Sequence, residues 1–270
     1  MEWIGIIYRM NSEIELMVFT DLDGSLIDHN TYEWAPARQA LTSLDNISAG
    51  VVLSSSKTAA EIGRLRAELG LEKWPAIVEN GAGILPPFVA DVATQSAYQD
   101  LLVTLAQVPP GLRRHFRGFA DITTTELADI TGLSPAAAAR AQNRCFSEPG
   151  QWLGTDAQQA EFVTLLTSWG IQVQQGGRFL TLSFGGNKAD QMRSIIKAYH
   201  PKHTIALGDA PNDVQMLEAA EFGVVVANPH RLPLPPLKGE PEGHVLRTQA
   251  AGPEGWNAAV LYLLNRLELQ

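Results

Sequence analysis

Cysteine is almost absent from this chain of 270 residues, and long hydrophobic runs are missing. The single cysteine, Cys145, excludes an internal disulfide and suits a reducing compartment. No segment approaches the roughly 20 consecutive apolar residues that a membrane helix needs, and the start of the chain lacks the pattern of a signal peptide. We therefore expect a soluble, cytoplasmic protein without a membrane partner.

Positive charge is also scarce. Lys and Arg number 20 against 29 Asp and Glu, and the resulting net charge of −9 argues against nucleic acid as a partner. An anionic small molecule stays compatible, because a few local cations suffice to bind it. Lysine is missing from Trp74 through Asn187, so arginine and histidine are the cations there. The fixed fork of arginine suits carboxylate and phosphate ligands, although genomic composition would explain the same bias.

Short apolar runs alternate with helical patterns at both ends of the chain. Strands rich in Val, Ile and Leu are expected at residues 16–20, 50–54, 76–78, 203–207 and 223–226. Helices are expected at residues 36–45, 58–69, 188–199, 211–220 and 254–268, and a Pro-rich surface loop at 228–243. This alternation predicts an α/β fold with a parallel sheet and helices on both faces.

The middle of the chain has a different pattern, in which helical segments predominate. Thr123 with Glu126 matches a capping box, and Ser134 precedes a helical proline. Two strand-like segments then flank the "QGG" turn at residues 175–177. We interpret residues 84–186 as an inserted α+β domain, with a core made of residues 1–83 and 187–270.

Acidic residues follow two of the expected strands. Asp21 and Asp23 stand at i and i+2, so they face one side of the carboxyl edge of the sheet, where open α/β folds bind ligands. Asp209 and Asp213 follow the strand at 203–207. Helix capping explains one acid there but not the whole cluster. The convergence predicts a hard cation held by oxygens, and Mg²⁺ fits best.

Hydroxyl groups and two lysines extend this candidate site. The strand at 50–54 runs into "SSSKT", where Ser54 and Ser55 are candidate hydroxyl groups and Lys57 is a candidate substrate-binding cation beside a helix start. Lys188 opens the helix after the insert, where the helix dipole disfavours a positive charge. Binding of an anionic partner would explain a lysine at this position. The alternative is a lysine exposed to solvent on the surface.

The stretches "DLDGS" and "GDAPND", the serine-ended strand and the isolated Lys188 resemble the four motifs of the haloacid dehalogenase superfamily. The resemblance implies a phosphatase that works through an aspartyl-phosphate. It makes Asp21 the nucleophile, Asp23 the proton donor and then the base, and Ser55 and Lys188 the phosphate ligands. In such an enzyme a carboxylate nucleophile divides hydrolysis into two steps.

The resemblance also implies the metal ligands. Asp21, the backbone carbonyl of Asp23, and Asp209 would bind Mg²⁺, with Asp213 in support. Ser25 replaces the commoner Thr, and Asn187 stands where Asp is more usual before the lysine. We expect altered loop geometry from these departures rather than lost catalysis.

Further phrases, among them "IVENGAGI", "TGLSPAAAARAQNRCFSEP", "QGGRF" and "GPEGW", resemble the mannosyl-3-phosphoglycerate phosphatase family from Leu16 onward. This implies a Rossmann-like core, an αβ cap that selects the substrate, and hydrolysis of 2-O-mannosyl-3-phosphoglycerate to mannosylglycerate, a compatible solute. The first fifteen residues precede the usual start, which leaves Met10 and Met17 as alternative initiators.

Several polar residues at the core–cap junction are candidate substrate contacts. Arg178 lies in a Gly-flanked turn from which its fork would reach a carboxylate, with an exposed hairpin arginine as the alternative. Glu79 and Asn80 follow a strand and would bind sugar hydroxyls, with a polar turn as the alternative. Arg144 and Glu148 are expected to pair on the cap surface rather than to touch substrate.

Three classes of function stay open. The first is a phosphatase of a glycosyl-3-phosphoglycerate, where mannosyl and glucosyl differ at one stereocentre that the sequence does not resolve. The second is a broader sugar-phosphate phosphatase or a mutase, although the large insert argues against a mutase. The third, a non-catalytic module that takes phosphate on an aspartate, would be shorter and would lack the acid at Asp23. The sequence is compatible with a monomer or a homodimer.

Overall fold

The computed structural model describes residues 13–90, 92, 95–176 and 178–269. Met10, one of the alternative initiators, and Gly177 of the expected turn lie outside these residues. Among the described helices, none combines the length and the apolar character needed to cross a membrane.

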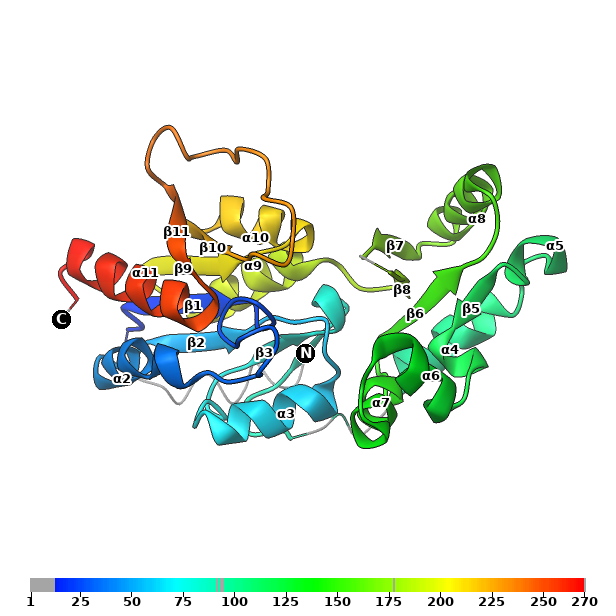
Figure 1. Ribbon diagram of the computed structural model, residues 1–270, viewed down its shortest axis with the longest axis horizontal. Helices are drawn as coiled ribbons and strands as arrows, with labels where there is room; N and C mark the ends of the chain where they lie inside the picture. The colour runs from blue at the N-terminus through cyan, green and yellow to red at the C-terminus, as the bar shows by residue number, and fades with distance from the viewer. Residues whose placement is uncertain (1–12, 91, 93–94, 177, 270) are drawn as a thin grey trace.

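The main lobe is built on a five-stranded sheet in the order β11-β10-β9-β1-β2 (Figure 1). Every neighbouring pair in it is parallel, which confirms the predicted α/β fold with a parallel sheet. Val18 in β1, an interior strand, pairs with Val51 on one side and with Ile205 on the other. The strands are β1 (Leu16–Thr20), β2 (Gly50–Leu53), β9 (His203–Gly208), β10 (Phe222–Ala227) and β11 (Val245–Ala251).

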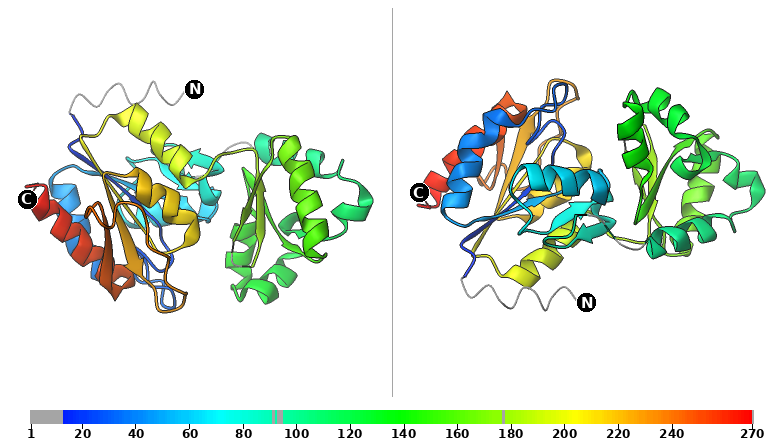
Figure 2. Two further views of the ribbon diagram at one scale, coloured as in Figure 1. Left: turned by 90° about the horizontal axis from the view of Figure 1, so that it is seen from above. Right: turned by 90° about the horizontal axis from the view of Figure 1, so that it is seen from below.

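Helices cover both faces of this sheet (Figure 2). Their apolar sides share one hydrophobic cluster with the buried strands, so burial of that cluster holds the lobe together. The 188–199 helix begins and ends as expected, and the others differ at their ends by a few residues. They are α2 (Arg38–Asn46) after a short turn η1 (Ala35–Ala37), α3 (Ala59–Glu68), α9 (Lys188–Tyr199), α10 (Val214–Ala219) and α11 (Gly252–Arg266).

The expected strand at 76–78 exists as β3 (Ala76–Val78), but it does not extend the parallel sheet. It pairs antiparallel with β4 (Gly83–Leu85), and a single bridge from Ile77 to Ser54 joins it to the main sheet. The turn η2 (Glu79–Gly81) reverses the chain between them, with Asn80 at φ +61°. This hairpin stays with the main lobe, because Leu85 belongs to its hydrophobic cluster.

The middle of the chain forms a second lobe around a four-stranded antiparallel sheet, in the order β5-β6-β8-β7. The expected hairpin around the "QGG" turn is present as β7 and β8, whereas β5 and β6 were not predicted. The strands of this antiparallel sheet are β5 (Phe116–Gly118), β6 (Ser147–Trp152), β7 (Gln172–Gln175) and β8 (Leu180–Ser183). Its helices are α4 (Ser96–Leu105), α5 (Pro110–Arg113), α6 (Thr124–Thr131), α7 (Pro135–Gln142) and α8 (Asp156–Ser168).

The helix starts of this second lobe follow the predicted signals. Thr123 accepts a hydrogen bond from the Glu126 amide and completes a capping box, and Ser134 caps α7 ahead of Pro135. The lobe has hydrophobic clusters of its own, one of them centred on the stacked rings of Phe116 and Phe162. The segment after β8 leads from this lobe back to α9 of the main lobe (Figures 1 and 2). The domain boundaries at 83/84 and 186/187 stay a prediction.

Candidate active site

Three aspartates converge at the carboxyl edge of the parallel sheet. Asp21 follows β1 and Asp209 follows β9, and because these strands are neighbours in the sheet their ends meet. Asp213 joins them from the short turn η4 (Pro211–Asp213). All three side chains are buried, and one oxygen from each lies within 4.8 Å of the others. The structure therefore brings together three of the four predicted metal-binding residues through their side chains.

Lys188 reaches into this cluster from the first turn of α9. Its Nζ donates to Asp21 Oδ1 at 2.6 Å and to Asp213 Oδ1 at 2.7 Å, and the residue is 1% exposed. Burial lowers the pKa of Lys188, but the two carboxylates outweigh burial, so the pKa lies above its ordinary value. The lysine is therefore a buried cation held by acids and not the solvated lysine of the alternative interpretation.

The negative charge of the cluster exceeds the positive charge around it. Burial, followed by the charge of Asp21, raises the pKa of Asp209 to about 6. Burial also raises the pKa of Asp213 to about 6, although Lys188 opposes the shift. Such shifts mark carboxylates that lack enough compensating charge. Buried carboxylate oxygens around an excess of negative charge fit a divalent cation, which Asp21 and Asp209 would hold.

Asp213 has a supporting position in the cluster. Its Oδ2 accepts the backbone N–H groups of Asp209 at 3.2 Å and Ala210 at 3.0 Å, while its Oδ1 accepts from Lys188. Gly208 leaves the space for this side chain, since a Cβ there would lie 2.5 Å from Asp213 Cγ. Asp213 thus fixes both the loop that carries Asp209 and the lysine.

The Asp23 side chain lies apart from the three clustered carboxylates. Lys57 Nζ donates to both of its oxygens, at 2.9 and 2.6 Å. Burial lowers the pKa of Lys57, but Asp23 outweighs it and leaves the pKa above its ordinary value. The ring of Tyr32 lies beside the same ammonium group, 5.6 Å from its centroid. Asp23 and Lys57 together form one wall of a cavity, described below.

The two candidate serines differ in their surroundings. Ser55 Oγ accepts the backbone N–H of Lys57 at 3.2 Å, which ties this hydroxyl to the loop beside the site. Ser54 Oγ is fully buried and has no hydrogen-bond partner among the described residues. Its backbone N–H donates to Thr20 O and holds the end of β2 beside β1.

Glu79 lies at the contact between the two lobes. Its Oε1 accepts the Cys145 N–H at 2.8 Å, and its Oε2 accepts the N–H and hydroxyl of Ser147 at 2.8 and 2.7 Å. Arg144 Nε lies 3.3 Å from Oε2, and the Glu79 side chain is completely buried. These contacts engage both oxygens of the Glu79 carboxylate. The predicted contact with a sugar hydroxyl would require this cap segment to move away.

Arg144 and Glu148 do not form the expected pair on the cap surface. Both are buried, and Arg144 pairs with Glu79 instead. Glu148 accepts hydrogen bonds from Tyr98 Oη at 2.7 Å and from the Ala120 N–H at 2.8 Å. The expectation was wrong because sequence proximity does not reveal that Arg144 pairs with the main lobe while Glu148 bonds within the second lobe.

A cavity of about 350 Å³ lies between the two lobes. Asp23, Lys57 and Asn80 line it from the main lobe, and Arg178 and Thr181 are among the residues that line it from the second lobe. It adjoins a second cavity of about 420 Å³, with which it shares Lys57 and other residues. The structure thus places four of the predicted catalytic or substrate-binding residues around one space.

Arg178 is held in place at the rim of this cavity. Its Nη1 donates to Ile130 O at 2.9 Å, and its guanidinium lies 5.7 Å from the ring centroid of Phe179. The residue stays exposed. Asn80, on the opposite wall, accepts a hydrogen bond from Asn212 at 3.0 Å. Both side chains are oriented by neighbours while still facing open space.

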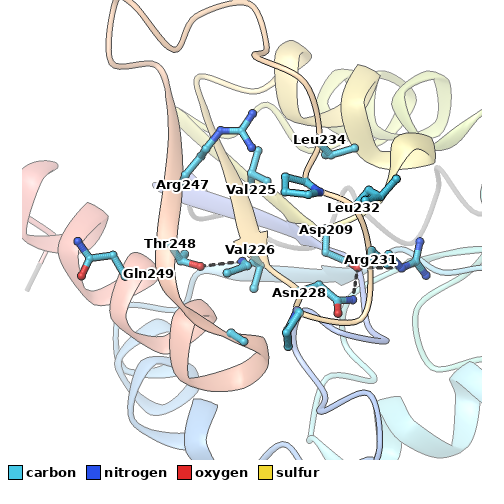
Figure 3. Close-up of a pocket in the computed structure, with 14 residues that line it drawn as sticks. Asp209, Val225, Val226, Asn228, Arg231, Leu232, Leu234, Arg247, Thr248 and Gln249 are labelled. Atoms are coloured by element: carbon cyan, nitrogen blue, oxygen red, sulfur yellow. Dashed lines mark hydrogen bonds and ion pairs between the residues drawn. The ribbon is translucent and has the colours of Figure 1, made fainter.

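Asn228 and Arg231 also touch the cluster of buried carboxylates, and they were not predicted. Asn228 Nδ2 donates to Asp209 Oδ2 at 2.7 Å, and Arg231 Nε lies 3.3 Å from the same oxygen (Figure 3). Both follow β10, the strand next to β9. The available signal was a polar residue directly after a buried strand, the same signal that identified the aspartates.

Comparison with known families and structures agrees with this geometry. Residues 159–232 match the family model of haloacid dehalogenase-like hydrolases. The matched segment contains Lys188, Asp209 and Asp213, so it includes the buried lysine and two of the three clustered carboxylates.

Solved structures resemble this chain over nearly its full length, although at low sequence identity. A haloacid dehalogenase-like hydrolase from Bacteroides thetaiotaomicron is 17% identical, with a TM-score of 0.62, over 93% of this chain and 100% of that one. A phosphatase of the same superfamily from that organism is 16% identical, with a TM-score of 0.60, over 97% and 98%. A subclass IIB sugar phosphatase is 14% identical, with a TM-score of 0.60, over 95% and 100%.

These likenesses establish the fold, and the family match adds the enzyme class. The chain has the fold of haloacid dehalogenase-like hydrolases, and its lysine and acidic motif lie in the segment that matches their family. The match to the family model supports a hydrolase, and the solved structures support its haloacid dehalogenase-like fold.

Proposed function

We propose that this protein is a Mg²⁺-dependent phosphatase of a phosphorylated glycoside, with 2-O-mannosyl-3-phosphoglycerate as the first candidate substrate. One observation carries the proposal. Asp21, which belongs to the buried cluster with Asp209, Asp213 and Lys188, stands two residues before Asp23, and Asp23 lines a cavity between the lobes. Such an arrangement provides a cation site, a nucleophile and a proton carrier at the end of one sheet.

In the proposed first step, an oxygen of Asp21 attacks phosphorus and forms an acyl-phosphate bond. The bond from phosphorus to the ester oxygen breaks, and Asp23 gives a proton to that oxygen, so the alcohol leaves neutral. Lys188 and Ser55 hold the phosphoryl oxygens. Mg²⁺, when bound, would reduce the repulsion between the substrate and the carboxylates.

In the proposed second step, Asp23 is ionised and takes a proton from water. The water oxygen attacks phosphorus, the bond to Asp21 breaks, and inorganic phosphate is released. Lys57 now donates to both oxygens of Asp23. A phosphate anion entering the cavity would attract the same ammonium group and free Asp23 to carry its proton.

The substrate class follows from the lining of the cavity. Lys57 and Arg178 suit anionic groups, while Asn80 and Thr181 offer hydrogen bonds for hydroxyls. A glycosyl-3-phosphoglycerate carries a phosphate, a carboxylate and a sugar and would use all of these groups. One similar fold belongs to a sugar phosphatase, so a broader sugar-phosphate phosphatase is the second candidate and a glucosyl substrate the closest variant.

Phosphate release in the presence of Mg²⁺ tests the proposal. The substrates are mannosyl-3-phosphoglycerate, glucosyl-3-phosphoglycerate, sucrose-6-phosphate and simple hexose phosphates, each assayed with and without EDTA. We expect the highest kcat/KM for a glycosyl-3-phosphoglycerate and no turnover with EDTA. Asp21→Asn should remove turnover, whereas Asp100→Asn, on the exposed side of α4, should not.

The possible outcomes separate the two parts of the proposal. If hexose phosphates are the best substrates, the assignment of the substrate is wrong and the chemistry stands. If no phosphomonoester is hydrolysed, or if Asp21→Asn matches the wild type, the catalytic assignment is wrong as well.

A further inference from the structure

The side chain of Asn228 is fixed at both ends. Its Oδ1 accepts the backbone N–H of His230 at 2.9 Å, and its Nδ2 donates to Asp209 Oδ2 at 2.7 Å. Only this orientation of the amide satisfies both contacts, because the reverse would set donor against donor and acceptor against acceptor. The loop after β10 therefore presents an N–H donor to the carboxylate in one defined direction.

The loop after β1 leaves the space that Asn228 fills. Gly24 has φ +89°, and a Cβ on it would lie 2.5 Å from Asn228 Nδ2 and 3.2 Å from Asp209 Oδ2. Glycine at this position thus permits both the turn and the close approach of the amide. Asn228 is in this way packed between the loop that carries Asp21 and Asp23 and the carboxylate of Asp209.

The two oxygens of Asp209 have different surroundings as a result. Oδ2 receives the Asn228 amide at 2.7 Å and lies 3.3 Å from Arg231 Nε. Among the described residues, the hydrogen bond to Oδ1 is a long one of 3.4 Å from Ser25 Oγ, and the Asp21 carboxylate also lies against the Asp209 side chain. A cation is coordinated by lone pairs that are not already engaged, so Oδ1 is the better ligand atom.

We infer that Asn228 is a positioning residue of the metal site, which occupies Oδ2 of Asp209 and directs Oδ1 toward the cation. Figure 3 shows the amide and Arg231 approaching Asp209 from the loop that follows β10. Hydrogen-bond partners of metal ligands orient those ligands, and their loss typically weakens metal affinity by about 10–100-fold. The inference rests on the proposed metal-dependent function but not on the identity of the substrate.

Mn²⁺ binding to the full chain tests this inference without an activity assay. Mn²⁺ is titrated into metal-free protein, and the free ion is followed by electron paramagnetic resonance. Asn228→Ala removes the amide, and Asn228→Leu removes its hydrogen bonds at nearly constant volume. We expect the dissociation constant of Mn²⁺ to rise about 10–100-fold in both variants, and to stay at the wild-type value in Asn265→Ala, an exposed control on α11.

A purely structural role for Asn228 would lower the unfolding temperature and leave the Mn²⁺ affinity unchanged. If either Asn228 variant is folded and binds Mn²⁺ within twofold of the wild type, the inference is overturned. Asp209→Asn is measured in parallel. If it binds Mn²⁺ as tightly as the wild type, the cation is not at this cluster, and the proposed metal-dependent function fails together with the inference.

Discussion

Lys188 Nζ lies 2.6 Å from Asp21 Oδ1, although 167 residues separate the two in the chain. Asp21 follows β1, an interior strand of the main sheet, and Lys188 opens the helix by which the chain returns from the second lobe. Both are buried. The pair therefore forms when the whole main lobe folds, and it places the candidate nucleophile beside a cation before any ligand arrives.

Replacement of this lysine should affect both stability and catalysis. Lys188→Met leaves Asp21 and Asp213 buried without their cation, which should lower the free energy of unfolding in EDTA by about 3 kcal/mol. Phosphate release should fall by about 10²–10³-fold, since a fixed positive charge at the phosphoryl group is lost. Urea unfolding and the phosphatase assay measure the two effects.

The matched control is Lys197→Met on the exposed side of the same helix, for which we expect a change within about 0.5 kcal/mol. Equal stability of the two variants would show that the buried pair contributes nothing to folding.

Without metal, the free energy of unfolding should fall as the pH rises through about 6, and bound metal should offset that loss. The raised pKa values of Asp209 and Asp213, each about 6, mean that the folded state binds protons more tightly than the unfolded state. Their contribution to stability is therefore complete below about pH 4 and is lost as the pH rises through about 6. Metal needs the ionised carboxylates, so it should restore stability in that range.

Thermal unfolding in EDTA and in Mg²⁺, from pH 4 to pH 8, measures this linkage. The difference in Tm between the two conditions should be near zero at pH 4 and reach its maximum above pH 7. A difference that stays constant with pH would exclude Asp209 as a metal ligand and Asp213 as its support.

The contact between the lobes can be tested at Glu79. In Glu79→Gln, an NH₂ group faces backbone N–H groups of the cap and Arg144 loses its carboxylate. We expect a loss of about 3 kcal/mol in the free energy of unfolding and faster hydrogen exchange at residues 145–147. Glu161→Gln, exposed on α8, is the control. Unchanged protection of those amides would rule out Glu79 as the anchor of this segment.

Arg178 distinguishes a substrate with a carboxylate from one without it. Arg178→Lys keeps the charge but loses the planar fork, so KM for glycosyl-3-phosphoglycerates should rise about 10–100-fold, as expected for a hydrogen bond to a charged group. KM for hexose phosphates should hardly change, because they have no carboxylate. Arg114→Lys, exposed at the end of α5, is the control. An equal rise for both substrate classes would contradict the carboxylate contact.

The strands that carry the site could be predicted because they are buried on both faces. The 16–20 and 203–207 segments read as continuous apolar runs, and their acidic ends pointed to one sheet edge. The missed strands lack that pattern. β11 has polar residues along an edge, and β6 contains Pro149 and Gly150, which both disfavour strands.

The contacts between the lobes could not be predicted, because they depend on the orientation of one lobe against the other. Nothing near Glu79 in the sequence indicates that its partner lies in the segment around Arg144, on the other lobe. Asn228 was missed for a different reason. A single Asn after a strand usually marks a turn, and its contact with Asp209 becomes visible only when β9 and β10 are known to be neighbours.

The attachment at Glu79 has a consequence for the evolution of specificity. The insert contacts the main lobe through the bonds of Glu79 to residues 144–147 and through the bond from the Thr58 hydroxyl to Arg140 O. Separate contacts of this kind fix one orientation of the insert. For the proposed phosphatase, we therefore expect a transplanted cap to dock correctly only together with a matching acid after β3, so that a residue of the main lobe would contribute to substrate choice.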